Sequence, residues 1–128
     1  MKLFVINASP RMESGNTHLV LSAFLDGLRS AGGRVDLAVL NRMRIERCVG
    51  CFTCYARTPG VCIHPDDDMP ALLERMQACD AFVLATPVYI DGMTALAKTF
   101  MDRLVVLMDP HLTEMDRIFN SHRFLQHP

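Results

Sequence analysis

The stretch that decides the fold runs from residue 3 to residue 17 and reads LFVINASPRMESGNT. It opens with the short continuous apolar run Leu3-Phe4-Val5-Ile6, which is typical of a strand buried on both faces of a parallel sheet. A polar loop with Gly15 follows and leads into a helical pattern at Asn16-Thr17. Asn16 is expected to cap this helix and Gly32-Gly33 to end it. The apolar residues at helix spacing are Leu21, Phe24, Leu25 and Leu28.

The same alternation of strand and helix continues along the chain. Residues 35–40 alternate like a second strand, and residues 81–85 form a third apolar run, expected to be a buried strand. Between them, Asp66-Asp67-Asp68 places negative charge where a helix would begin, which is favourable at the positive end of the helix dipole. Residues 94–108 carry a last strong helical pattern. The order predicts an α/β layer fold around a parallel sheet.

The composition limits the classes of protein to which the chain can belong. The chain has 128 residues, half of them hydrophobic, and a formal net charge of −1. That is one domain's worth of sequence, and the near-neutral charge gives no reason to expect nucleic acid as a partner. No apolar run approaches the roughly 20 residues that cross a bilayer, and the start of the chain lacks the features of a signal peptide. A cytoplasmic protein without a membrane partner is expected.

The loop after the first strand has the chemistry of a phosphate site. A helix N-terminus offers unpaired N–H groups and a positive dipole end to an anion, and Gly15 lets the backbone approach closely. An ordinary capped helix would need similar residues. The loop lacks the Lys of a P-loop, the glycine pattern of dinucleotide folds and the Cys of a thiol phosphatase, which leaves a phosphate monoester such as FMN. The candidate phosphate ligands are Ser9, Arg11, Ser14, Asn16 and Thr17.

A second loop follows the third strand, from Thr86 to Thr94. In open α/β sheets, ligands bind beyond the carboxyl ends of the strands, and FMN lies between the first and third strands of such folds. The backbone of this loop could therefore contact the pyrimidine edge of a flavin, and Tyr89 offers a flat face. The candidate flavin-binding residues are Pro87, Val88, Tyr89 and Gly92.

Four of the five cysteines lie in one segment without periodicity, residues 41–65. Their spacing, Cys48-x2-Cys51-x2-Cys54-x7-Cys62, is tighter than the two separated pairs of most zinc sites and matches the compact binding of a [4Fe–4S] cluster better. Free thiols, a redox disulfide and zinc remain alternatives. The fifth, Cys79, is expected to be a small buried apolar residue.

Four separate segments, in this order, resemble the NADPH-dependent FMN reductase superfamily. They are Ser9-Pro10-Arg11…Gly15-Asn16-Thr17, Cys48-Val49-Gly50-Cys51-Phe52-Thr53-Cys54, Asp67-Asp68-Met69 and Thr86-Pro87-Val88-Tyr89. The cysteine spacing is similar to that of the iron–sulfur flavoprotein branch. The resemblance covers residues 1 to about 110 and implies a flavodoxin-like three-layer sandwich with strand order 2-1-3, an FMN cofactor, a [4Fe–4S] cluster and a homodimer or homotetramer.

The resemblance also implies an FMN-dependent oxidoreductase that exchanges electrons with a nicotinamide donor, NAD(P)H, or a reduced carrier. Residues 1–110 are expected to form the FMN-binding domain, with the cysteine loop 41–65 inserted, and residues 111–128 a polar tail. The later strands of a flavodoxin-like sheet are not recognisable in the sequence, so they are expected to be either missing or supplied by another subunit. Two alternatives remain: an FMN or quinone reductase without a cluster, and a non-enzymatic flavodoxin-like module. No protein side chain is predicted to act as a catalytic acid or base.

Overall fold

The computed structural model describes residues 1–108. Three parallel strands, β1 (Lys2–Asn7), β2 (Arg34–Val39) and β3 (Ala81–Ala85), form a sheet in the order β2-β1-β3. This is the predicted order 2-1-3, with the strand of the opening stretch at the centre. The helices are α1 (Asn16–Ser30), α2 (Thr53–Ala56), α3 (Met69–Gln77) and α4 (Ala95–Arg103), with 3₁₀ segments at Met12–Ser14, Leu40–Arg42 and Leu104–Leu107.

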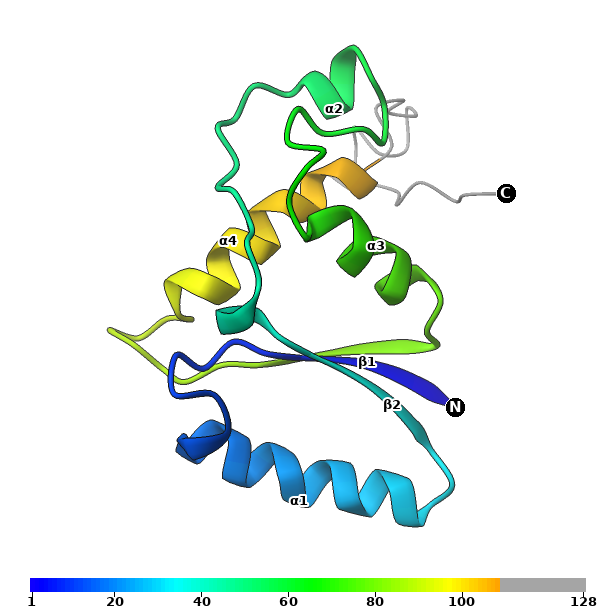
Figure 1. Cartoon of the computed structure of the whole chain (residues 1–128), viewed down its shortest axis with the longest axis vertical. Helices are drawn as coiled ribbons and strands as arrows, with labels where there is room; N and C mark the ends of the chain where they lie inside the picture. Colours follow the sequence, from blue (N-terminus) through cyan, green and yellow to red (C-terminus); the bar gives the residue numbers. More distant parts are fainter. Residues whose placement is uncertain (109–128) are drawn as a thin grey trace, which may run out of the picture.

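The helices cover both faces of the sheet, as Figure 1 shows. Because successive side chains of a strand point to opposite faces, Phe4 and Ile6 of β1 pack with α3 and α4, whereas Leu3 and Val5 pack with α1. The apolar run of β1 is continuous because each of its faces meets a helix layer. The predicted flavodoxin-like three-layer sandwich is confirmed.

Three details of the predicted helices are wrong. Gly15, not Asn16, is the N-cap of α1, and it makes no side-chain cap hydrogen bond. Phe24 was expected on the buried face of α1, but 48% of it is exposed, because it lines an open groove beside β3 instead of the core. The last helix ends at Arg103 and continues to Leu107 as a tighter 3₁₀ turn rather than as an α-helix to Met108.

The third strand is less buried than its apolar sequence predicts. None of its five residues is fully buried, and Phe82 is 37% exposed. The cause is its position, because β3 pairs only with β1 and forms an edge of the sheet within residues 1–108. Whether another subunit supplies further strands stays a prediction.

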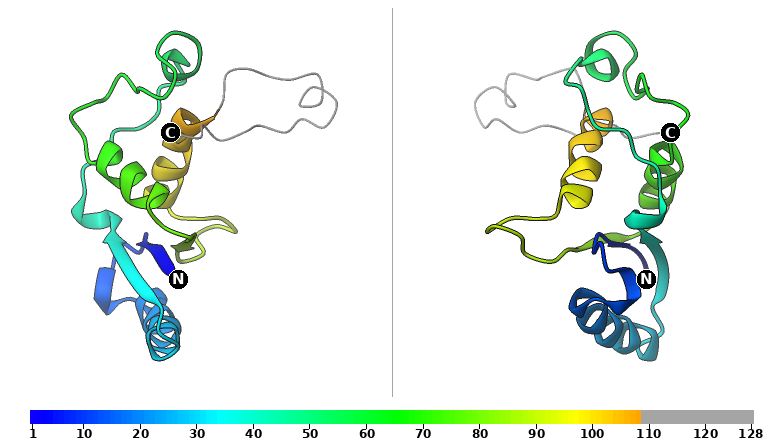
Figure 2. Two further views of the ribbon diagram at one scale, coloured as in Figure 1. Left: turned by 90° about the vertical axis from the view of Figure 1, so that its right-hand side faces the viewer. Right: turned by 60° about the vertical axis from the view of Figure 1, so that its left-hand side comes forward.

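The cysteine segment, predicted as a long loop, contains the short helix α2. It lies beyond the ends of α3 and α4 that are remote from the sheet (Figure 2). Cys54 of α2 packs against Val106 and Leu107 in a small apolar cluster of its own. The predicted polar tail, residues 111–128, lies outside the described residues. No helix within residues 1–108 combines the length and apolar character needed to span a bilayer.

Candidate functional site

The loop after β1 is held in a tight turn by its own polar groups. The Ser9 N–H donates to Asn7 Oδ1 at 2.9 Å, and the Arg11 N–H donates to Ser9 Oγ at 3.2 Å. The Ser14 hydroxyl donates to the Arg11 carbonyl at 2.7 Å. Asn7 and Ser9 are buried. These bonds bring the predicted residues Ser9, Arg11 and Ser14 together directly before the N-terminus of α1.

Gly15 leaves a space in this turn that a side chain would fill. A Cβ atom at this position would lie 2.8 Å from Ser9 Oγ and 3.2 Å from Arg11 Cβ. Its φ of −91° is open to any residue, so the space, not the backbone conformation, requires glycine. A phosphate group needs close approach to backbone N–H groups at a helix N-terminus. The residues present therefore fit the phosphate of FMN.

Replacing Gly15 with Ala is expected to weaken FMN binding about 5- to 150-fold. The added methyl group displaces Ser9 Oγ, and overpacking of this kind costs about 1–3 kcal/mol. Titration calorimetry of the purified variant with FMN measures the loss.

The matched control is Gly27→Ala on the exposed side of α1, where a Cβ atom meets no other atom within 4 Å. This change should stabilise the helix by about 0.5–1 kcal/mol and leave the FMN affinity unchanged. Equal FMN affinities in the two variants would contradict a role of Gly15 in the phosphate site.

Thr94 ties the second loop to the first. It is buried at the N-cap of α4, where its Oγ1 accepts a hydrogen bond from the Ala97 N–H and donates to the Ala8 carbonyl at 2.9 Å. Its own N–H donates to Thr86 Oγ1 at 3.1 Å. These bonds hold the loop after β3 and the N-terminus of α4 against the loop after β1.

The loop from Thr86 to Gly92 ends in a two-residue turn. Tyr89 and Gly92 exchange backbone hydrogen bonds of 2.8 and 3.0 Å, and Ile90 and Asp91 between them both have positive φ. The tip projects into solvent, with Val88 77% exposed. The predicted residues Pro87, Val88, Tyr89 and Gly92 thus share one projecting loop beside the phosphate turn.

Asn16 and Thr17 lie slightly apart from the phosphate turn. Together with Thr86 they line an open groove of about 580 Å³ between the start of α1 and the end of β3. The structure therefore divides the predicted phosphate residues between two neighbouring places, the turn of Ser9, Arg11 and Ser14, and this groove.

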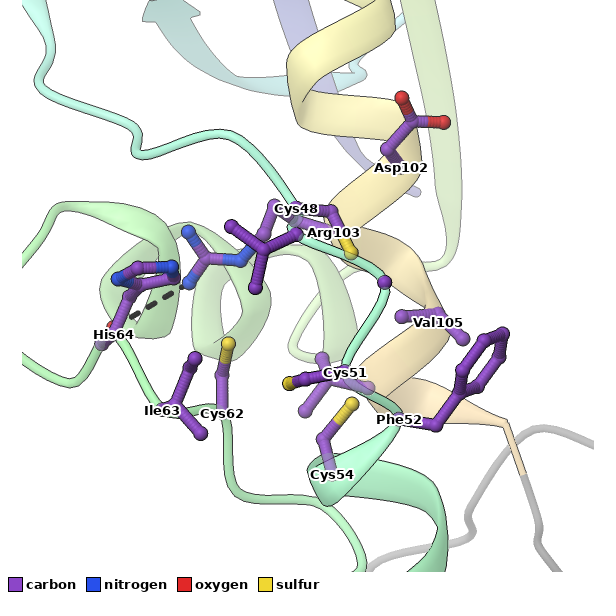
Figure 3. Close-up of a pocket in the computed structure, with 13 residues that line it drawn as sticks. Cys48, Cys51, Phe52, Cys54, Cys62, Ile63, His64, Asp102, Arg103 and Val105 are labelled. Carbon is purple, nitrogen blue, oxygen red and sulfur yellow. Dashed lines mark hydrogen bonds between the residues drawn. The ribbon is translucent and has the colours of Figure 1, made fainter.

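All four cysteines of the cysteine segment line one pocket of about 300 Å³ (Figure 3). Three sequence segments form it: residues 48–54, residues 62–64 and the end of α4 with the following 3₁₀ turn. Its remaining lining is mostly apolar and includes Val49, Phe52, Ile63, Val105 and Val106.

The thiols lie close enough to influence one another. Burial raises the pKa of the Cys54 thiol, and the neighbouring Cys62, Cys48 and Cys51 thiolates raise it further. By contrast, hydrogen bonds from Thr53 lower the pKa of the exposed Cys51 thiol.

The arrangement of the four cysteines can be compared with the ligand sets of a zinc ion and of a [4Fe–4S] cluster. Within residues 1–108, no three His, Cys, Asp or Glu side chains gather tightly enough to hold one metal ion, and all five cysteines are free thiols. A zinc ion would need four ligands at about 2.0–2.3 Å from one centre. In a [4Fe–4S] cluster each thiolate binds a different iron, and four cysteines around an apolar pocket fit that donor set.

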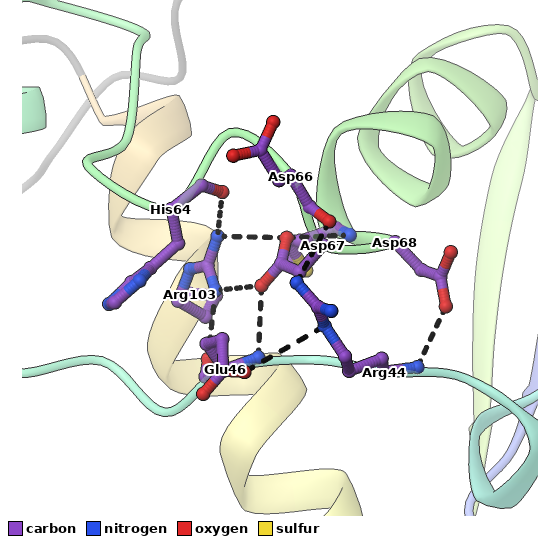
Figure 4. Close-up of polar contacts among 8 residues, drawn as sticks. Arg44, Glu46, His64, Asp66, Asp67, Asp68 and Arg103 are labelled. Atoms are coloured by element: carbon purple, nitrogen blue, oxygen red, sulfur yellow. Dashed lines mark hydrogen bonds and ion pairs between the residues drawn. The ribbon is translucent and has the colours of Figure 1, made fainter.

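A buried ion pair between Arg103 and Asp67 lies beside the pocket, and Arg103 is one of the lining residues. Figure 4 shows the polar contacts of this pair. Arg103 Nη1 lies 2.5 Å from Asp67 Oδ2, with the side chains 2% and 0% exposed. Burial opposes ionisation of Asp67, but hydrogen bonds from Arg103 and from the Glu46 and Met69 N–H groups outweigh it and lower the pKa of this carboxyl. Burial likewise opposes the Arg103 charge, but Asp67 and the Cys62 and Cys48 thiolates raise the pKa of the guanidinium. Both groups are therefore charged at neutral pH.

The two candidate sites lie at opposite ends of α4. Thr94 caps the helix beside the loops that follow β1 and β3, and Arg103 ends it in the cysteine pocket. The nine residues of α4 span about 14 Å at 1.5 Å per residue.

Comparison with known proteins assigns the chain to a protein family. The family model for NADPH-dependent FMN reductase matches residues 1–120. The chain belongs to the NADPH-dependent FMN reductase family. An iron-sulfur flavoprotein of Archaeoglobus fulgidus is 39% identical over 105 residues, which are 82% of this chain and 46% of the relative.

A second curated relative agrees with this assignment, and a solved structure shows the same fold. An iron-sulfur flavoprotein of Methanocaldococcus jannaschii is 36% identical over 103 residues, which are 80% of this chain and 50% of the relative. The solved structure of RosB, with a bound 8-demethyl-8-formylriboflavin-5'-phosphate, superposes with a TM-score of 0.69 at 20% identity. That superposition covers 91% of this chain and 46% of RosB. The chain spans about half the length of the curated relatives it matches.

In this member of the NADPH-dependent FMN reductase family, sequence reasoning missed four residues that shape the sites: Asn7, Thr94, Asp67 and Arg103. A signal existed for Thr94, because Thr directly before a helical pattern is a preferred N-cap. Asp67 was interpreted as favourable charge at a helix start and as part of a segment shared with the family, but not as one half of an ion pair. Its partner Arg103 is 36 residues away, and no periodic pattern links positions so far apart.

Proposed function

We propose that this chain is the FMN-binding part of an electron-transfer oxidoreductase that also carries a [4Fe–4S] cluster. The observation that carries the proposal is the gathering of all four cysteines of the segment around one mostly apolar pocket, at the end of α4 opposite the FMN loops. The names of the iron-sulfur flavoprotein relatives support it.

The residues of this chain have separate tasks in the proposed function. Ser9, Arg11 and Ser14 bind the phosphate of FMN, with Asn16 and Thr17 at the adjacent helix start. Pro87, Val88, Tyr89 and Gly92 line the flavin ring, while Thr94 holds their loop in place. Cys48, Cys51, Cys54 and Cys62 bind the cluster. When bound, FMN supplies two-electron chemistry and the cluster single-electron transfer, and the protein orients them and tunes their potentials.

The partners follow from this chemistry. We propose a nicotinamide donor or a reduced electron carrier as the redox partner. A reducing, cytoplasmic setting keeps thiols such as the exposed Cys51 available for the cluster. We further propose a homodimer or homotetramer, since β3 is an exposed sheet edge within the described residues and exposed edges favour pairing with another chain.

Anaerobic purification tests the proposal. We expect a flavin absorption spectrum with a broad iron–sulfur shoulder, together with iron and sulfide near the content of one cluster per chain. Added FMN should raise the melting temperature of flavin-free protein, because a ligand at 100 times its Kd stabilises the native state by about 2.7 kcal/mol.

Each alternative gives a different result. Bound FMN without iron would replace the proposal with a flavin or quinone reductase that has free thiols. A protein that takes up neither FMN nor iron would overturn it in favour of a non-enzymatic module.

A further inference from the structure

Arg103 is an unusual residue to find at the edge of the cysteine pocket. It ends α4 and is only 2% exposed, although arginine is almost never buried without partners. Its pairing with Asp67 explains why the charge is tolerated. The pairing does not explain why Arg103 also lines the pocket that the four cysteines share.

The two Nη groups of Arg103 hold both ends of the cysteine segment. Nη1 donates to Asp67 Oδ2 at 2.5 Å and to the Glu46 carbonyl at 2.8 Å. Nη2 donates to Asp67 Oδ1 and to the His64 carbonyl, each at 3.4 Å. Glu46 lies two residues before Cys48, and His64 lies two residues after Cys62. One guanidinium therefore fixes the chain on both sides of the cysteines.

The third nitrogen of the Arg103 guanidinium, Nε, takes no part in these contacts. Its Nε is buried and has no hydrogen-bond partner among residues 1–108. A buried donor without a partner lowers the stability of the folded protein by about 1–3 kcal/mol. A hydrogen-bond acceptor beside this atom would remove that penalty. In Figure 3 the guanidinium lies between His64 and the sulfur atoms of Cys48 and Cys62. Within residues 1–108, His64 Nε2 is the other buried side-chain nitrogen without a hydrogen-bond partner. His64 lines the same pocket as Arg103.

We propose that Arg103 is a positioning residue that holds the cysteine segment through its Nη groups and donates its Nε–H to a sulfur of the iron–sulfur cluster, raising the reduction potential of the cluster. The inference rests on the proposed function. Hydrogen bonds to the sulfurs and nearby charge tune the potentials of such clusters. The reduced cluster carries one more negative charge than the oxidised one, so a buried cation with a free donor stabilises the reduced form more.

Replacing Arg103 with Lys tests this role. Lysine keeps a positive charge within reach of Asp67 but has neither the planar fork nor an N–H at the Nε position. We expect the variant, titrated under EPR detection, to show at least a tenfold shift of the redox equilibrium toward the oxidised cluster. For a one-electron couple this lowers the midpoint potential by about 59 mV.

The matched control is Arg75→Lys. Arg75 also pairs with a carboxylate, with Nη2 at 2.5 Å from Asp36 Oδ1, and donates to the Leu37 carbonyl. It does not line the cysteine pocket, so its replacement should leave the cluster potential unchanged. An Arg103→Lys protein with wild-type iron content and a wild-type potential would overturn the inference while leaving the proposed function intact.

A second measurement does not depend on the variant folding. Wild-type protein prepared with nitrogen-labelled arginine should show a coupling between an arginine nitrogen and the reduced cluster in pulsed EPR. Absence of that coupling in iron-loaded wild-type protein would also overturn the inference. Wild-type protein that takes up no iron would instead contradict the proposed function itself.

Discussion

Replacing Cys51 with Ser is expected to abolish the bound iron and sulfide of the protein while leaving its fold intact. Cys51 lines the cysteine pocket but its side chain is exposed, so the substitution leaves the packing of the apolar cores unchanged. The loss therefore reports on cluster binding and not on folding. Iron and sulfide analysis of anaerobically purified protein measures it, with circular dichroism as the check on the fold.

Cys79→Ser is the matched control for this experiment. Cys79 is half-buried, lies outside the pocket and packs against the main core. The control should retain the wild-type iron content, and both variants should retain FMN, because the flavin loops lie at the other end of α4. Wild-type iron content in the Cys51→Ser protein would contradict the assignment of Cys51 as a ligand.

Replacing Asp67 with Asn is expected to have the largest effect on stability, about 3–5 kcal/mol. The substitution removes the charge that balances Arg103 at a place where neither side chain has appreciable contact with water. It also weakens the bonds from the Glu46 and Met69 N–H groups, at 2.9 and 3.1 Å. A loss of this size should lower the melting temperature by at least about 10 °C.

The effect of Asp67 should depend on pH. Because the folded protein lowers the pKa of this carboxyl, its contribution is fully present above the unfolded value of about 3.9. The contribution is lost as the pH falls through the lower, folded pKa. The stability difference between wild type and Asp67→Asn should therefore shrink below about pH 4.

Urea titrations at several pH values measure this dependence. The neighbouring Asp66→Asn, at an exposed residue, is the control and should change the free energy of unfolding by less than about 0.5 kcal/mol. Equal destabilisation by the two substitutions would contradict the role of the buried pair.

The sequence was most informative where the signal is local. The run Leu3-Phe4-Val5-Ile6 predicted a strand covered on both faces, and the sheet has that strand at its centre. The three-residue steps between Cys48, Cys51 and Cys54 predicted a common site, and all three line one pocket. These predictions succeed because the residues that form each feature are neighbours in one short segment.

Local patterns gave wrong predictions of burial where burial depends on another helix or strand. The residues of β3 look like a buried strand, yet Phe82 is partly exposed, because burial depends on whether a neighbour covers the strand. Phe24 of α1 is exposed for the same reason.

The sequence by itself determined the fold class, the polar loop from Ser9 to Thr17 between the first strand and the first helix, and the grouping of the cysteines, since each follows from residue types at fixed short spacing. Only the tertiary structure decided what holds these parts in place. It joined Thr94 to the Ala8 carbonyl and Arg103 to Asp67. These contacts bridge 86 and 36 residues of sequence, and chain folding, not periodicity, brings such partners together.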